Sequence, residues 1–138
     1  RIAGIPYAGL PLGVAASLAG GIPMVYPRKE VKDYGTRKLI EGEYAPGERV
    51  LVIDDIITDG ASKIEAIEPL EEAGLQVTDV LVILDREQGG DRILARSGYE
   101  LHSLGKLSEV LDALAAAGSV DPATRAKVSR FIEEHQFA

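Results

Sequence analysis

The fold is decided by one stretch of the sequence, Val50-Leu51-Val52-Ile53-Asp54-Asp55-Ile56-Ile57-Thr58-Asp59-Gly60-Ala61-Ser62. Its first residues are apolar without alternation, which is typical of a strand buried on both faces. Two carboxylates end this predicted strand, and a short loop with hydroxyl side chains and a glycine leads into a predicted helix over residues 62–73. The stretch therefore predicts one strand–helix unit of a parallel sheet.

Strand and helix patterns also alternate outside that stretch. Further strands are predicted over residues 1–5, 24–26 (the weakest pattern) and 77–84, where the acid Asp85 follows. Further helices are predicted over residues 12–19, 91–96, 108–117 and 121–135. The last begins with Asp121-Pro122 as N-cap and first helical residue. Pro69 conflicts with the helix over 62–73, which is either kinked there or shorter. We expect one α/β domain over residues 1–138, with a mainly parallel sheet flanked by helices.

Composition and charge narrow the class of protein. The 138 residues contain no cysteine, which excludes disulfides, thiolate nucleophiles and cysteine-ligated zinc. A net charge of −7 is unusual for a general nucleic-acid binder, and no apolar run is long enough to span a bilayer. We expect a cytoplasmic protein whose partners are neither nucleic acid nor membrane.

One short segment departs from the acidic average. Residues 28–38 carry five basic and two acidic side chains. They lie in a longer segment, 27–47, that has no convincing period and is expected to be a binding loop or lid without regular structure. A cationic loop on an anionic body suits the capture of a small polyanion, although a solvated surface loop has the same composition.

The stretch over 54–62 combines two kinds of chemistry. Backbone amides at the start of a helix, helped by the hydroxyls of Thr58 and Ser62, bind a phosphate well, and Gly60 allows close approach. The carboxylates of Asp54 and Asp55 repel a phosphate and suit sugar hydroxyls or Mg²⁺ instead. Together they predict a site for a ribose 5-phosphate.

Two other interpretations compete. In one, Thr58 or Asp59 only caps a helix and the two acids are solvated. In the other, the chain is a receiver domain with Asp85 as phosphoacceptor, since such domains also place two acids at a strand end. The receiver interpretation gives residues 58–62 no role and does not explain the strand and helix that precede the acid pair.

These residues resemble the phosphoribosyl-diphosphate (PRPP) signature of type I phosphoribosyltransferases. Three other segments resemble loops of orotate phosphoribosyltransferases: the pyrophosphate loop (Gly4-Ile5-Pro6-Tyr7-Ala8-Gly9-Leu10-Pro11-Leu12), the catalytic loop (Arg28-Lys29-Glu30-Val31-Lys32-Asp33-Tyr34-Gly35-Thr36) and the orotate loop (Asp85-Arg86-Glu87-Gln88-Gly89-Gly90). The resemblance covers nearly the whole chain and is strongest to the transferase half of bifunctional UMP synthases. It implies the type I phosphoribosyltransferase core without the N-terminal segment that covers the orotate site.

The resemblance also implies roles for individual residues. The residues implied to be catalytic are Lys32, Asp54 and Asp55, with Lys32 as the main catalytic cation. The residues implied to bind PRPP are Tyr7, Ala8, Arg28, Lys29, Lys32, Tyr34, Asp54, Asp55, Ile56, Ile57, Thr58, Asp59, Gly60, Ala61 and Ser62. Those implied to bind orotate are Thr58 and Arg86, whose guanidinium fits a carboxylate. Mg²⁺ is implied as the cofactor, held mainly through PRPP and without direct protein ligands.

The family further implies a homodimer in which the loop over 28–38 acts on the neighbouring site. Two positions depart from many bacterial members, which have histidine in place of Tyr34 and lysine in place of Ala8. Two alternatives remain open: a PRPP-binding module without catalysis, and a phosphoribosyltransferase for another base. The basic loop residues together with Arg86 favour the orotate enzyme over both.

Overall fold

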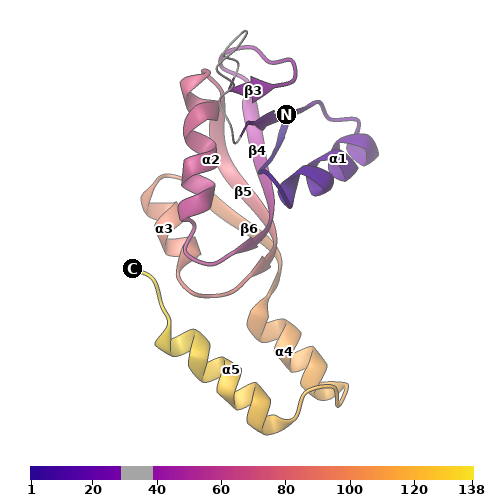
Figure 1. The fold of residues 1–138 in the computed structure, drawn as a ribbon, viewed down its shortest axis with the longest axis vertical. Helices are drawn as coiled ribbons and strands as arrows, with labels where there is room; N and C mark the ends of the chain where they lie inside the picture. The colour runs from indigo at the N-terminus through magenta and orange to yellow at the C-terminus, as the bar shows by residue number, and fades with distance from the viewer. Residues whose placement is uncertain (29–38) are drawn as a thin grey trace.

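A computed structural model of the protein describes residues 1–28 and 39–138. Within these residues, six strands form one sheet in the order β3-β2-β1-β4-β5-β6 (Figure 1). The strands are β1 (Ile2–Gly4), β2 (Met24–Pro27), β3 (Ile40–Glu41), β4 (Arg49–Ile57), β5 (Gln76–Asp85) and β6 (Glu100–Lys106). All neighbours pair in parallel except β2 and β3. The predicted α/β class with a mainly parallel sheet is confirmed.

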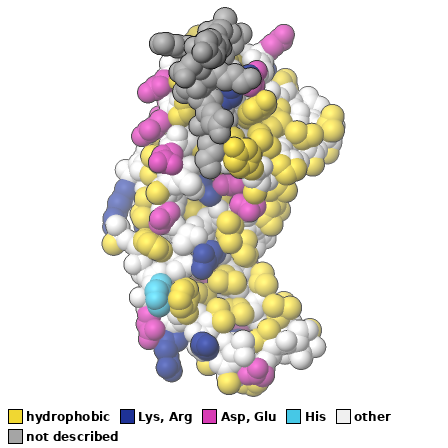
Figure 2. Space-filling view, in the orientation of Figure 1, with side chains coloured by type: hydrophobic (Ala, Val, Ile, Leu, Met, Phe, Trp, Pro, Cys, Tyr) yellow, Lys and Arg dark blue, Asp and Glu magenta, His cyan; other side chains and the backbone are white. Residues whose placement is uncertain are grey.

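Helices cover both faces of the sheet. They are α1 (Gly9–Gly20), α2 (Ala61–Glu72), α3 (Gly90–Arg96), α4 (Leu107–Ala116) and α5 (Pro122–Glu134). Figure 1 shows α2 and α3 on one side of the sheet and α1 on the other, while α4 and α5 extend beyond its end. Figure 2 shows acidic side chains along the edge formed by α2 and hydrophobic ones over α1. None of the described helices has the length and apolar character needed to cross a bilayer.

The main core lies between the sheet and α2. Val52 of β4 and Val80 of β5 are fully buried and belong to one cluster with Ile67 and Leu70 of α2. Removing such β-branched and leucine side chains from water is the main force that fixes this helix on the sheet. The packing sets where β4 ends and α2 begins, and therefore the shape of the turn between them.

Several predicted boundaries shift. Strand β4 continues to Ile57 because its pairing with β5 extends to Ile57 opposite Asp85, so the two acids lie inside the strand rather than at its end. Helix α1 begins at Gly9 instead of residue 12. Helix α2 runs through Pro69 to Glu72, so the helix is not shortened at the proline. Asp121 caps α5 as predicted, accepting a hydrogen bond from the Thr124 amide at 2.9 Å.

Two strands were not predicted. The segment over 27–47, expected to lack regular structure, contains β3, which pairs antiparallel with β2 at the sheet edge. Strand β6 was missed because its residues alternate between exposed and half-buried, and none is fully buried. A strand on the edge of a sheet needs few apolar residues, so its sequence carries a weak signal.

Candidate functional site

The strand order creates a switch point between β1 and β4. The chain leaves β1 toward β2 and leaves β4 toward β5, in opposite directions along the sheet. In open α/β sheets, ligands bind beside such a point, at the carboxyl ends of the strands. The loop after β1 carries Tyr7 and Ala8, and the turn after β4 carries Thr58 to Gly60. The predicted pyrophosphate and ribose-phosphate segments therefore flank the switch point.

The predicted ribose-phosphate turn, residues 57–62, has the expected form of a short connection from a strand to a helix. It leads from β4 directly into α2, with Gly60 at the N-cap and a φ of 84°. Few other residues adopt this left-handed conformation readily. The carboxylate of Asp59 accepts a hydrogen bond from the Ala61 amide at 3.0 Å. The turn thus presents the positive end of a helix beside β1, as an anion site requires.

The two adjacent aspartates have different environments. Asp54 is 7% exposed, and its Oδ2 lies 2.6 Å from Nζ of Lys63, which is 5% exposed. The Asp55 side chain is exposed, and its Oδ1 accepts a hydrogen bond from the Ile56 amide at 2.7 Å. Asp55 is therefore available to a ligand, whereas Asp54 already has a cationic partner. That both bind ribose hydroxyls stays a prediction.

Sequence reasoning missed Lys63. Its Nζ lies between the Asp54 carboxylate and the Ser62 hydroxyl, 3.3 Å from Ser62 Oγ. A lysine in the first turn of α2 follows two acids closely in sequence, which was the available signal. A charged pair this deeply buried is held by both partners, because either charge alone would be costly to bury.

The predicted orotate loop, residues 85–90, is called the base loop below, and it meets the predicted ribose-phosphate turn. The Arg86 amide donates to the Ile57 carbonyl at 3.1 Å, and Arg86 Nη1 lies 3.4 Å from Thr58 Oγ1. The two residues predicted to bind orotate are thus brought together from neighbouring strand ends. Burial raises the pKa of the Asp85 carboxyl above its usual value, although a hydrogen bond from the Glu87 amide opposes this.

A cavity of about 300 Å³ lies beside the switch point. Its lining includes Ser62 of the turn, Pro6 of the loop after β1, and Arg28. The guanidinium of Arg28 forms an ion pair with Glu41 of β3. The cavity therefore joins parts of three predicted segments. The predicted residues Lys29, Lys32 and Tyr34 lie outside the described residues.

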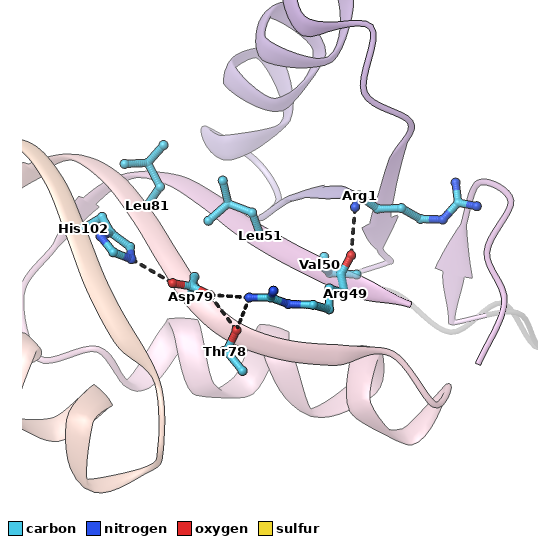
Figure 3. Close-up of a pocket in the computed structure, with 8 residues that line it drawn as sticks. All are labelled: Arg1, Arg49, Val50, Leu51, Thr78, Asp79, Leu81 and His102. Atoms are coloured by element: carbon cyan, nitrogen blue, oxygen red, sulfur yellow. Dashed lines mark hydrogen bonds and ion pairs between the residues drawn. The ribbon is translucent and has the colours of Figure 1, made fainter. Parts of the chain in front are cut away.

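A larger cavity, of about 480 Å³, lies elsewhere (Figure 3). It opens on the amino-terminal half of β4 and β5, where Asp79 lies between Arg49 and His102. Nε2 of His102 is 2.9 Å from Oδ1 of Asp79, and Glu100 is close enough to complete a group of three possible metal ligands. No predicted site residue lines this cavity, so its size does not make it the candidate site.

Comparison with known proteins identifies close relatives. Uridine 5'-monophosphate synthase of Bos taurus is 44% identical over 136 residues, which is 99% of this chain and 28% of that protein. Orotate phosphoribosyltransferase of Halobacterium salinarum is 42% identical over 112 residues, which is 81% of this chain and 64% of that protein. The solved structure of Leishmania donovani UMP synthase is 37% identical with a TM-score of 0.88, covering 97% of this chain and 29% of that one.

The chain thus spans less than two thirds of the length of these relatives. No family model matches it. The similarity extends over nearly all of this chain, including the strand ends that carry the predicted site.

Proposed function

This chain is homologous to orotate phosphoribosyltransferases and has the type I phosphoribosyltransferase fold, and on that premise we propose that it transfers the phosphoribosyl group of PRPP to orotate. The products are orotidine 5'-monophosphate and diphosphate, formed in de novo pyrimidine synthesis. The substrates are those implied by the names of the relatives.

The observation that carries the proposal is the approach of Arg86 to Thr58. It joins a guanidinium, suited to the orotate carboxylate, to a turn suited to a ribose phosphate. A transferase needs its acceptor and donor side by side in a fixed orientation, because positioning supplies much of the rate. The two loops meet at the carboxyl ends of adjacent strands, which supports one site with two substrates.

The proposed reaction forms a bond between an orotate nitrogen, which releases its proton, and the ribose carbon, whose bond to the diphosphate oxygen breaks. Positive charge develops on the sugar ring and negative charge on the leaving group. In our proposal the amides of the turn hold the 5-phosphate and Asp55 holds ribose hydroxyls. Arg28, Lys29 and Lys32 neutralise the diphosphate. Such fixed charges act mainly by electrostatic stabilisation of the transition state.

Mg²⁺ is part of the proposal as the cofactor. It is a hard cation that prefers oxygen ligands and keeps few protein contacts when it binds phosphates. In the proposal Mg²⁺ is held mainly through PRPP, and the exposed carboxylate of Asp55 is left to the ribose hydroxyls, whereas Asp54 is already paired with Lys63. When bound, Mg²⁺ would neutralise part of the diphosphate charge. A homodimer with the loop over 28–38 acting between subunits, and a cytoplasmic location, also belong to this proposal.

Base selectivity tests the proposal. Release of diphosphate from PRPP and Mg²⁺ is measured with orotate, uracil, adenine and hypoxanthine in turn. We expect turnover with orotate and a strong preference over uracil, which lacks the carboxylate. Arg86→Ala should lower that preference roughly 10- to 100-fold, because one charge-assisted interaction contributes about 1.5–3 kcal/mol.

Arg96→Ala is the matched control, since Arg96 is an exposed arginine in the last turn of α3 that forms no hydrogen bond or ion pair with the described residues. Its preference for orotate should equal that of the unmodified protein. If the protein binds PRPP but releases no diphosphate with any of the bases, the proposal is wrong and the protein is a PRPP-binding module. Turnover with a purine but not orotate would replace it with another transferase.

A further inference from the structure

The C-terminal tail, residues 135–138, returns to the base loop. Figure 1 shows the chain leaving α5 and ending beside α3, far from α4 and the start of α5. Three hydrogen bonds join the tail to the loop. Gln88 Nε2 donates to the His135 carbonyl at 2.9 Å, the Phe137 amide to the Gln88 carbonyl at 2.8 Å, and Gln136 Nε2 to the Glu87 carbonyl at 2.7 Å. The tail therefore bonds to the loop backbone at Glu87 and Gln88 and to the Gln88 side chain.

The fit between tail and loop is close. Gly89 has a φ of 104°, and a Cβ built there would lie 2.3 Å from the Phe137 carbonyl oxygen. No other residue type would allow this approach without moving the backbone. Arg92 of α3 completes the contact, because its Nη2 donates to Gln136 Oε1 at 2.9 Å and to the Phe137 carbonyl at 3.3 Å.

The base loop needs this support. Glu87 has a φ of 58°, an uncommon conformation for a residue other than glycine. Such a residue persists where its surroundings fix it. The Glu87 carbonyl accepts from the tail, and its carboxylate accepts from the Ser108 amide at the start of α4, at 2.7 Å. The conformation of the residue next to Arg86 is thus set by contacts from distant parts of the chain.

We propose that the tail is a clamp that holds the base loop in the form that recognises the base, with Gln136 and Arg92 as positioning residues for Arg86. The inference rests on the proposed function for the role of Arg86. The clamp acts through the loop backbone and touches no substrate. Loosening it therefore weakens recognition of the base and leaves the ribose-phosphate turn unaffected.

The test uses the intact protein with Gln136→Ala and, separately, Arg92→Ala. Gln136→Ala removes the hydrogen bond to the Glu87 carbonyl and the one from Arg92. Arg92→Ala removes both hydrogen bonds between α3 and the tail. We expect KM for orotate to rise about five- to tenfold, as loss of about one hydrogen bond implies. KM for PRPP should change less than twofold. Hydrogen exchange at the amides over 86–90 should become faster, while exchange over 58–62 stays the same.

Arg92→Lys should restore most of the affinity, because lysine keeps a donor and a charge, and Arg96→Ala is the control on the same helix. An unchanged KM for orotate, or equal rises in both KM values, overturns the clamp. Absence of orotate turnover in the unmodified protein overturns the proposed function instead. In that case hydrogen exchange alone tests the clamp. Faster exchange over 86–90 in the two alanine variants supports the clamp, and unchanged exchange rejects it.

Discussion

The ribose-phosphate turn and the base loop are neighbours that are held in different ways. They follow adjacent parallel strands and touch through Arg86 and Thr58. The turn is fixed by residues close to it in sequence, such as Asp59 with Ala61. The base loop is fixed by partners 47 and 49 residues away.

Each region also has a buried carboxylate at or near it, and the two carboxylates have different partners. Asp54 and Asp85 are 7% and 6% exposed, and each lies near the end of its strand. Asp54 pairs with Lys63, whereas Asp85 has no ion pair among the described residues and accepts from the Glu87 amide at 2.8 Å. The buried carboxylate before the turn is thus compensated by a charge pair, whereas the one that begins the base loop accepts only a backbone hydrogen bond. This difference makes their responses to mutation distinguishable.

The largest effect is expected at the charge pair that flanks the turn. Lys63→Met leaves the Asp54 carboxylate buried beside an apolar side chain. Removing one partner of a buried pair costs about 3–5 kcal/mol, because the remaining charge stays desolvated. Urea unfolding of the variant should show this loss relative to the unmodified protein.

The double variant Asp54→Asn/Lys63→Met is the control for that interpretation. Replacing both charges removes the uncompensated carboxylate, so most of the lost stability should return. If the double variant is as unstable as Lys63→Met, the loss comes from packing rather than from charge, and the turn is not held by a local pair.

A smaller effect is expected where the two regions touch. Gly90 begins α3, and a Cβ there would lie 2.6 Å from Ile57 Cγ1 and 2.9 Å from the Thr58 carbonyl oxygen. Gly90→Ala must push the base loop away from the turn, and overpacking of this kind costs about 1–3 kcal/mol. Unfolding by urea measures the cost.

Gly105→Ala is the matched control, because nothing lies within 4 Å of a Cβ built at Gly105 in β6. Its stability should stay within about 0.5 kcal/mol of the unmodified protein. If both variants lose a similar amount of stability, the loss in Gly90→Ala does not come from the contact between turn and loop.

The contrast also explains what the sequence predicts. The turn was predicted almost completely, because a buried strand, two acids, a glycine and a helix start are all local signals. Only the pairing of Asp54 with Lys63 and the extra length of β4 were missed, since both depend on packing against neighbouring elements. Arg86 was predicted from its motif, and the structure brings it to Thr58.

The support of the base loop could not be predicted. Gln136 has no motif around it, and its contact with Glu87 depends on how α4 and α5 turn back. Strand β6 was missed for a related reason, because pairing with β5 defines it more than its own residues do. Long-range contacts of this kind leave little trace in a single sequence.

The smallest expected effect concerns Asp85 and depends on pH. Burial raises the pKa of this carboxyl above its usual value of 3.8, and the nearby charges of Asp91 and Glu87 act in the same direction, while the hydrogen bond from the Glu87 amide and the charge of Lys106 oppose them. A raised pKa in the folded state means that folding favours the protonated form. Its contribution to stability is therefore fully present below pH 3.8 and is lost as pH rises through the folded value.

Asp85→Asn separates this charge effect from the hydrogen bond. Asparagine keeps an oxygen that accepts from the Glu87 amide and has no carboxyl to ionise. The variant should gain stability over the unmodified protein as pH rises from 4 to 7, by less than Gly90→Ala loses, as urea unfolding at several pH values would measure. A difference that stays constant over this range would mean that the Asp85 charge is compensated as well as that of Asp54. The proposed difference between the carboxylate of Asp54, which is paired with Lys63, and that of Asp85, which has no such partner among the described residues, would then be wrong.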